Sequence, residues 1–368
     1  MTTPQGTLWK IKPHTRAKHE ILRRYLGAWF RILASSFSKL VYVDGFCGPG
    51  RYQGGEAGSP LVAIEAAQGL PEGVQAELHF TDWDRQRLHH LTLELRSQKP
   101  PPNVAIKCER AHFDGYLRSL LDHLATTRMP PMFVFVDPFG FSKVPYALLK
   151  RLLSYRSTEV LITFSADAVN RFLGHPNEKI RALIIDLFGT KRVLEIVDSA
   201  ASDRIVALRD LYQQQLLEAA RFVRFFEMRD ERDRVVYYLF FASNNHLGHK
   251  RMKEAMWKVD PDGEFRFSDA TDVDQPVLFT MDVTAIVSKS IMNRFRQAGQ
   301  VSVKEVIEFI VNDTPFIDKH VRPALRKLEG DGDVRVNPLK ASGKPRRTGT
   351  FPPDAVIRFP GSKSDNHG

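Results

Sequence analysis

Short apolar runs alternate with longer helix-like segments through the first half of the chain, and this alternation restricts the folds open to it. The strand-like runs are LVYVD (40–44), AELHFTD (76–82), NVAIKC (103–108), MFVFVD (132–137) and EVLITFS (159–165). Segments with apolar residues at helical spacing separate them, at 59–70, 85–98, 115–125 and 146–154. Continuously apolar strands are typical of a parallel sheet that helices cover on both faces. The sequence therefore predicts an α/β fold with a mostly parallel sheet.

The segments around this region extend the prediction. Residues 14–34 have the pattern of an amphipathic helix, and we interpret its basic start, HTRAKHEIL, as a solvated face rather than a phosphate clamp. RFVRFFEM and RVVYYLFFAS, joined by the turn-like RDERD, predict a hairpin that closes one edge of the sheet. Residues 174–220 are expected to be a mostly helical insertion, because they lack the strand-like runs.

The C-terminal part has a pattern of its own. The acidic, proline-containing stretch SDATDVDQPV marks a boundary, which predicts one domain over 1–272 and a second over 279–360. Residues 283–297 are expected to form the first helix of this part. Ser302 and Glu305 form a capping-box pattern before a second helix, and HVRPALRKL belongs to a third, which begins late or kinks at Pro323. Two short strands follow around KASGKPRR. This order predicts a winged helix-turn-helix, followed by a disordered tail at 361–368.

Charge and cysteine content indicate the cellular compartment of the protein and the kind of partner that it binds. The net charge of +10 favours a polyanionic partner such as a nucleic acid. Cys47 and Cys108 can form neither a disulfide framework nor a four-cysteine zinc site, and His246 and His249 lack an accompanying ligand set, so we expect no metal site. The chain shows no signal peptide and no apolar run of membrane-spanning length. We therefore expect a soluble, cytoplasmic protein without membrane contact.

The most informative stretch is LVYVDGFCGPG (40–50), which passes from an apolar strand into an aspartate and then into glycines. In an open parallel sheet, ligands bind outside the carboxyl ends of the strands, so Asp44 is expected to face that crevice. The pattern D-x-F-x-G-x-G differs from the dinucleotide fingerprint G-x-G-x-x-G, which disfavours a nicotinamide oxidoreductase. A ligand with an amino group suits Asp44. Asp82 ends the next strand, where a ribose diol would bind, and Asp84 competes for that role.

These motifs together resemble a class I S-adenosylmethionine-dependent methyltransferase, a Rossmann-like fold. The chain is most similar to the bacterial three-Cys-motif partner (TcmP) family, through HTRAKHEIL, YVDGFCGPGRYQGGEAGSP, FVDPFG and LGHKRMKEAMWKVD. The resemblance covers about the first 270 residues, and the family's usual C-terminal module resembles the winged helix. It implies S-adenosylmethionine as the cofactor and, as a partner, a three-Cys-motif protein that resembles radical-S-adenosylmethionine enzymes.

The resemblance also implies roles for individual residues near the strand ends. The methionine end of the cofactor would lie along Asp44, Phe46, Gly48 and Gly50. Asp82 would bind the ribose, and Trp83 would pack on the adenine. For the adenine amine, His112 and Asp114 both stand near the expected place.

The tetrapeptide DPFG supplies the candidate catalytic residues, Asp137, Pro138 and Phe139. Methyltransferases that act on nucleobase amines often use D/N-P-P-Y/F, and the tRNA N2-guanine dimethyltransferases resemble this chain in using DPFG. An exocyclic amine is a poor nucleophile because the ring delocalises its lone pair. An aspartate and a backbone carbonyl that accept its two protons would help to direct that lone pair at the methyl group. Phe139 is expected to stack on the base.

Two hypotheses follow for the whole chain. The first is a methyltransferase that acts on a nucleic-acid base nitrogen together with the three-Cys-motif partner. The second is a non-catalytic, nucleic-acid-binding accessory of that partner in DNA repair or nucleotide modification. The winged helix would either supply affinity for the nucleic acid or dock the partner. Its candidate nucleic-acid contacts are the basic residues of the wing, Lys340, Lys344, Arg346 and Arg347.

Overall fold

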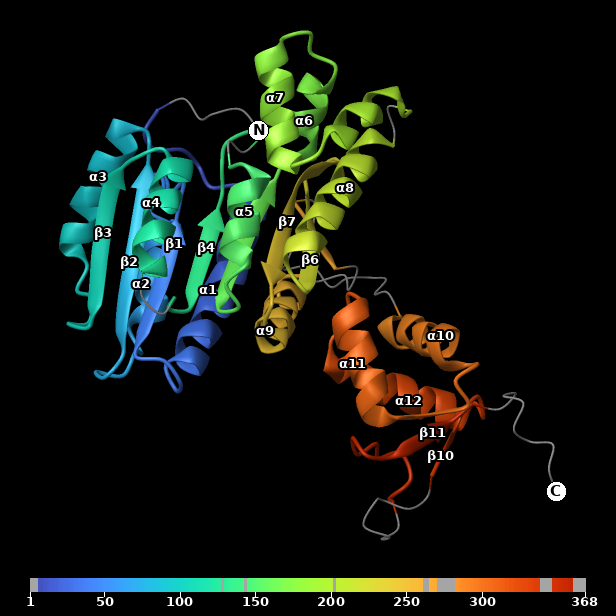
Figure 1. Ribbon diagram of the computed structural model, residues 1–368. Coiled ribbons are helices and arrows are strands. Elements are labelled where there is room, and N and C mark those ends of the chain that lie inside the picture. Colours follow the sequence, from blue (N-terminus) through green and yellow to red (C-terminus); the bar gives the residue numbers. More distant parts are fainter. Residues whose placement is uncertain are drawn as a thin grey trace, which may run out of the picture. The chain divides into compact units, whose positions relative to one another are not determined.

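The computed structural model describes residues 6–126, 129–141, 144–200, 203–260, 265–269, 282–337 and 346–359 (Figure 1). The described residues up to 269 belong to one compact unit, and those from 282 belong to a second.

The first unit is built on a sheet with the strand order β3-β2-β1-β4-β5-β7-β6-β8, counted over its described residues. The parallel strands β1 to β5 come first in the chain, and β7 pairs antiparallel with both β5 and β6. The α/β prediction with a mostly parallel sheet is therefore confirmed. The bounds are β1 (Lys39–Asp44), β2 (Gln75–Asp82), β3 (Val104–Arg110), β4 (Met132–Val136), β5 (Thr158–Phe164), β6 (Phe222–Arg229), β7 (Val235–Ser243) and β8 (Arg266–Ser268).

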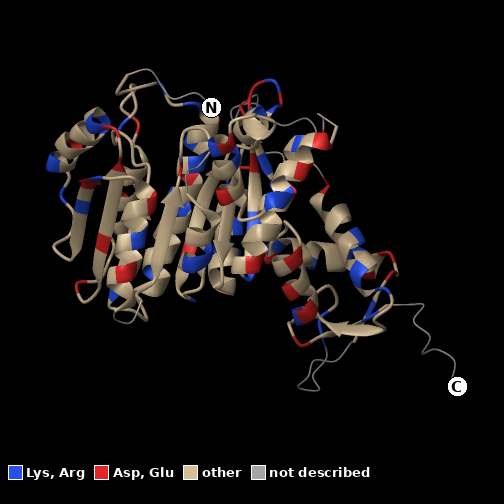
Figure 2. Cartoon of the chain, turned by 45° about the horizontal axis from the view of Figure 1, so that its top comes forward, with Lys and Arg blue, Asp and Glu red and all other residues tan. Residues whose placement is uncertain are grey.

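Helices cover both faces of this sheet (Figure 1). On one face α1 packs against α2 and α9, and on the other α5 packs against α4 and α8. Figure 2 shows that charged residues gather on the helices and loops, whereas the central strands are largely free of them. Every residue of β4 and β5 is buried, as their apolar sequences predict. The helices are α1 (Pro13–Leu33), α2 (Ser59–Ala67), α3 (Arg85–Ser97), α4 (Phe113–Ala125), α5 (Tyr146–Leu153), α6 (Ala166–Leu173), α7 (Glu178–Phe188), the 3-10 helix η1 (Lys191–Asp198), α8 (Arg204–Ala219) and α9 (His246–Trp257).

The predicted hairpin exists, but its place in the sheet differs from the expectation. Strands β6 and β7 pair antiparallel as predicted, and β7 lies next to β5. The hairpin does not close the edge, because β8 pairs in parallel with β6 beyond it. The three residues of β8 are too few for a periodicity to reveal them in the sequence.

The second unit contains three α-helices and a small sheet within its described residues. Ser302 caps α11 as predicted: its hydroxyl accepts the Glu305 N–H at 3.1 Å, and the Glu305 carboxylate accepts the Ser302 N–H at 2.7 Å. Pro323 lies in the first turn of α12, where its missing N–H costs nothing, so the late start is the correct alternative. The elements are α10 (Val283–Phe295), β9 (Gln300–Ser302), α11 (Val303–Asp313), the 3-10 helix η2 (Asp318–His320), α12 (Val321–Gly330), β10 (Arg335–Val336) and β11 (Val356–Arg358).

The antiparallel sheet of this unit has the order β10-β11-β9, so a strand that the sequence pattern did not reveal, β9, joins the two expected ones. The predicted boundary at 273–278 and the predicted tail at 361–368 lie outside the described residues. Of the helices that the structure describes, none is long and apolar enough to span a membrane.

Candidate active site at the strand ends

A pocket of about 60 Å³ lies where β1 and β4 end. This is the point at which the strand order reverses, the usual ligand position in an open α/β sheet. Six of the predicted residues line it, in two groups. They are Phe46, Gly48 and Gly50 from the loop after β1, and Asp137, Pro138 and Phe139 after β4.

Asp44 lies beneath this pocket and does not line it. Its side chain is completely buried, so the expectation that it faces an open crevice is wrong. One carboxylate oxygen accepts the Phe46 N–H at 3.3 Å, while Oδ2 has no hydrogen-bond partner. Burial raises the pKa of Asp44 to about 7, against the effects of the Ser59 side chain and the Phe46 N–H, which both lower it. A buried acceptor without a donor is costly, and a ligand that donates to Oδ2 would satisfy it.

Asp82 shapes the glycine loop. Its two oxygens accept the Gly48 N–H at 3.1 Å and the Asp84 N–H at 2.8 Å. Gly48 and Gly50 have φ values of +64° and +84°, in the left-handed region that favours glycine. Asp84, the competing residue, caps α3 by accepting the backbone N–H groups of Gln86 and Arg87. Asp82 is thus the carboxylate that connects the end of β2 to the loop, and burial raises its pKa.

Trp83 and His112, which follow β2 and β3, lie against each other. Their rings are stacked with centroids 3.8 Å apart and planes 13° apart. The guanidinium carbon of Arg110 lies 4.6 Å from the Trp83 ring centroid. Because stacked rings at this distance are in van der Waals contact, an adenine cannot lie between them. Trp83 is 54% exposed, so its free edge is accessible to a ligand.

A buried lysine that the sequence interpretation missed lies beside the candidate catalytic carboxylate. Lys18 of α1 donates from Nζ to Asp137 Oδ2, and the Lys18 and Asp137 side chains are 4% and 21% exposed. Nζ also lies 5.1 Å from the Tyr237 ring centroid. A signal was present, because Lys18 shares the helical stripe of Leu22 and Tyr25.

The interpretation of HTRAKHEIL as a solvated face is therefore wrong. His14 and His19 are also buried, at 3% and 4% exposure. Burial lowers the pKa of His19 to about 3. His14 hydrogen-bonds through its ring nitrogen and its backbone N–H to the two carboxylate oxygens of Asp269, both at 2.6 Å. In the described parts of the chain, no group of three or more His, Cys, Asp or Glu is placed to hold a metal ion.

Aromatic residues close over the pocket. Phe139, expected to stack on a base, instead contacts the Trp9 ring edge-on at 5.5 Å between centroids. The Arg87 guanidinium carbon lies 4.9 Å from the Phe139 ring centroid and 5.2 Å from that of Trp9. A hydrogen bond from the Gln53 N–H to the Trp9 carbonyl, at 2.9 Å, holds the segment in place. Trp9 was missed because a single aromatic residue before a helix carries no periodic signal.

The predicted nucleic-acid contacts of the second unit differ from one another. Lys340 and Lys344 lie outside the described residues. Arg347 is exposed, but the Arg346 side chain is only 5% exposed and forms an ion pair with Glu329. Arg346 also donates to the Thr350 carbonyl at 2.6 Å. The expectation that Arg346 offers its charge to a phosphate therefore needs correction, because the charge is already neutralised within the unit.

No protein-family model and no curated protein matches this sequence. Several solved structures show a distant likeness. The Legionella pneumophila protein LPL1258 is 13% identical, with 65% of this chain and 86% of that chain covered and a TM-score of 0.39. The plantazolicin methyltransferase BpumL, in complex with a monoazolic desmethylPZN analog and SAH, is 14% identical over 63% and 86%, with a TM-score of 0.26. PKMT2 from Rickettsia typhi is 10% identical over 89% and 75%, with a TM-score of 0.33. At these TM-scores the likenesses carry no argument about activity.

Proposed function

We propose that this protein is an S-adenosylmethionine-dependent methyltransferase whose cofactor binds where β1 and β2 end. The strand order supports a ligand site here, because the order reverses at this edge of the sheet, the usual ligand position in an open α/β sheet. The observation that carries the proposal is the buried Asp44 Oδ2, which has no hydrogen-bond partner and lies directly before the glycine loop. The amino group of the methionine moiety has the donors that this oxygen lacks.

The residues around Asp44 fit the rest of such a cofactor. Backbone in the left-handed region at Gly48 and Gly50 lets the loop approach a ligand closely. Asp82, at 8% exposure, would accept from a ribose hydroxyl with its remaining lone pairs. The exposed edge of Trp83 would contact the adenine, with His112 behind it. The cofactor, when bound, supplies a methyl group made electrophilic by its sulfonium.

For the acceptor, we propose an exocyclic nitrogen of a nucleic-acid base. Asp137 would accept one proton of this amine through Oδ1, since Oδ2 already bonds to Lys18. The Lys18 ammonium, which donates to Oδ2, holds the carboxylate in a fixed orientation. Stacking of the base on Phe139 requires that Trp9 and Arg87 move away from its ring.

The second unit would supply affinity for DNA or RNA. Its order of three α-helices and two C-terminal strands supports a winged helix-turn-helix. The exposed Arg347, with Lys340 and Lys344, would contact phosphates. The proposal includes the three-Cys-motif partner as well. Its only support is the sequence resemblance to the three-Cys-motif partner family.

The test begins with calorimetric titration of the full chain with S-adenosylmethionine, S-adenosylhomocysteine and NAD. We expect both sulfur compounds to bind and Asp44→Ala to abolish their binding. Methyl transfer from tritiated cofactor to total DNA and RNA follows. Asp137→Asn should lower the single-turnover rate by about 100-fold to 1000-fold while cofactor affinity is retained. The control is Asp122→Asn, at an exposed carboxylate paired with Arg151. Binding of NAD alone would overturn the proposal.

One observation favours the second candidate, a non-catalytic accessory. Asp137 is already paired with Lys18, and Phe139 is covered by Trp9 and Arg87. A wild-type protein that binds S-adenosylhomocysteine, yet transfers no methyl group with or without its partner, would support this candidate.

A further inference from the structure

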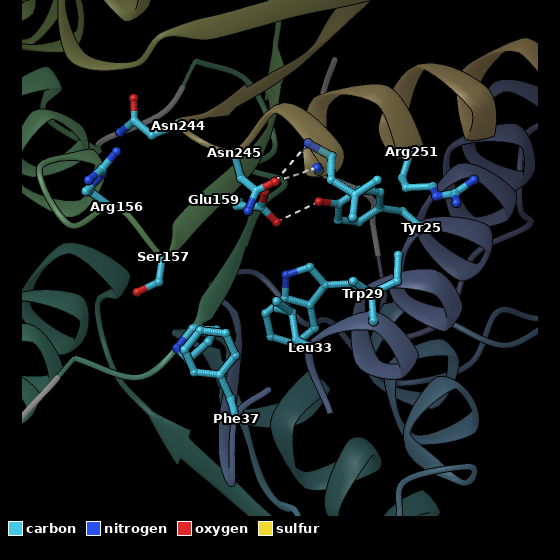
Figure 3. Close-up of a pocket in the computed structure, with 14 residues that line it drawn as sticks. Tyr25, Trp29, Leu33, Phe37, Arg156, Ser157, Glu159, Asn244, Asn245 and Arg251 are labelled. Atoms are coloured by element: carbon cyan, nitrogen blue, oxygen red, sulfur yellow. Dashed lines mark hydrogen bonds between the residues drawn. The ribbon is translucent and has the colours of Figure 1, made fainter. Parts of the chain in front are cut away.

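A second pocket, of about 320 Å³, lies at the opposite edge of the same sheet, where β4 and β5 begin (Figure 3). The C-terminal half of α1 and the start of α9 form its sides. None of its lining residues belongs to the pocket at the carboxyl ends of the strands. Its volume is within the usual range for small-molecule sites.

Most of the wall of this pocket is apolar or aromatic. Trp29 and Leu33 of α1 and Phe37, which follows it, face the same space, as Figure 3 shows. Pro131 and Leu247 add to the apolar wall. Such walls favour a ligand with an apolar body, and aromatic rings also attract cations.

A buried carboxylate, that of Glu159, forms the polar end of the pocket. Glu159 is 4% exposed. Its oxygens accept the Tyr25 hydroxyl at 2.6 Å and the Ser243 hydroxyl at 2.7 Å. Both donors are neutral, and no ion pair joins Glu159 to a lysine, arginine or histidine within the described residues. Burial raises the pKa of this carboxyl, against the side-chain hydrogen bonds of Tyr25, Ser243 and Trp29, which lower it.

The carboxylate is held rigidly in this position. A Cβ atom at Gly248 would lie 2.0 Å from Glu159 Oε1 and 3.0 Å from the Tyr25 hydroxyl, so a side chain at this position would displace the carboxylate. Asn245 caps the same end of α9 by accepting the N–H groups of Leu247 and Gly248, at 2.8 and 3.0 Å (Figure 3). A fixed carboxylate binds a partner without first losing conformational freedom.

We propose that this pocket binds a small organic cation, a protonated amine on an apolar or aromatic body, with Glu159 as its counter-charge. A buried carboxylate without a cationic partner is costly, and the ammonium group removes that cost. The aromatic wall then contacts the body of the ligand. This proposal is independent of the methyltransferase proposal, because the two pockets share no residue.

The two arginines that line this pocket do not oppose a cation strongly. Arg251 forms an ion pair with Glu254 at 2.7 Å, which neutralises it. Arg156 is exposed, so water and salt screen its charge. The Glu159 carboxylate is shielded from solvent, and its interaction with a bound cation is therefore the stronger one.

The test uses three probes that share a phenyl ring and differ in charge: 2-phenylethylammonium, 2-phenylethanol and phenylacetate. We expect the full-length protein to bind the ammonium about tenfold more tightly than the alcohol, and phenylacetate more weakly than either. Ligand-observed NMR titration measures the three affinities. In Glu159→Gln the ammonium and the alcohol should bind equally. Asp122→Asn is the control, because it removes an exposed carboxylate that does not line this pocket and should leave the preference intact.

A second variant keeps the test decisive if Glu159→Gln does not fold. Leu33 is only partly buried, so Leu33→Trp should fold and fill the pocket, with loss of ammonium binding. Equal affinity of wild type for the ammonium and the alcohol would overturn the proposal. So would a preference that survives in Leu33→Trp.

Discussion

Asp137→Asn and Lys18→Met should destabilise the first unit unequally, although each removes one partner of the same ion pair. In Asp137→Asn the Lys18 ammonium stays in a place where its side chain is only 4% exposed. In Lys18→Met the remaining carboxylate belongs to a side chain that is 21% exposed, which gives water access to it. Asp137→Asn should therefore lose more stability than Lys18→Met, because it leaves the charge that has less access to water.

The magnitudes follow from those two environments. A buried charge that loses its partner costs about 3 to 5 kcal/mol, which is the expectation for Asp137→Asn. A partly hydrated group that loses a hydrogen bond costs about 1 to 3 kcal/mol, which is the expectation for Lys18→Met. The double variant Lys18→Met/Asp137→Asn leaves no charge behind, so it should be more stable than Asp137→Asn alone.

Urea unfolding followed by tryptophan fluorescence measures these differences. The four tryptophans of the chain, Trp9, Trp29, Trp83 and Trp257, all belong to the first unit, so the signal reports that unit alone. A shift of the midpoint at constant slope gives the change in unfolding free energy. If Asp137→Asn costs no more than Lys18→Met, or if the two losses simply add in the double variant, Lys18 is not a buried charge that depends on Asp137.

Four further results are expected. Asp44 has a pKa of about 7 in the folded protein against 3.8 as a free group, so the folded protein binds the proton more tightly than the unfolded chain does. The unfolding free energy should therefore fall as pH rises between these two pKa values. Asp44→Asn should remove up to about 4 kcal/mol of this dependence, measured by urea unfolding between pH 4 and 8. Arg346→Ala should lower the stability of the second unit, measured by calorimetry. Neutralising the three other basic residues of the wing, Lys340, Lys344 and Arg347, should instead reduce the slope of log nucleic-acid affinity against log salt concentration by up to about 2.7. An unchanged slope would exclude the wing as a phosphate contact. Deleting residues 279–368 should leave S-adenosylhomocysteine affinity unchanged by calorimetric titration, unless the second unit completes the site.

Local patterns in the sequence were enough to predict the parallel strands, the helices between them and the glycine loop. Each depends on a few consecutive residues, such as the apolar run before Asp44 or the capping box at Ser302 and Glu305. Since parallel strands end at the same edge of a sheet, the motifs at 46–50 and 137–139 were expected together, and they line one pocket.

Tertiary structure alone decided how these residues are partnered, because the partners lie far apart in the chain. Lys18 and Asp137 are 119 positions apart, Tyr25 and Glu159 are 134 apart, and His14 lies 255 positions from Asp269. A periodicity extends over a few turns or strands and contains no information about such pairs. The helical stripe of Leu22 and Tyr25 indicated which face Lys18 shares, but that Asp137 is its partner, and that Glu159 has Tyr25 and Ser243 as partners, became visible only in the folded chain.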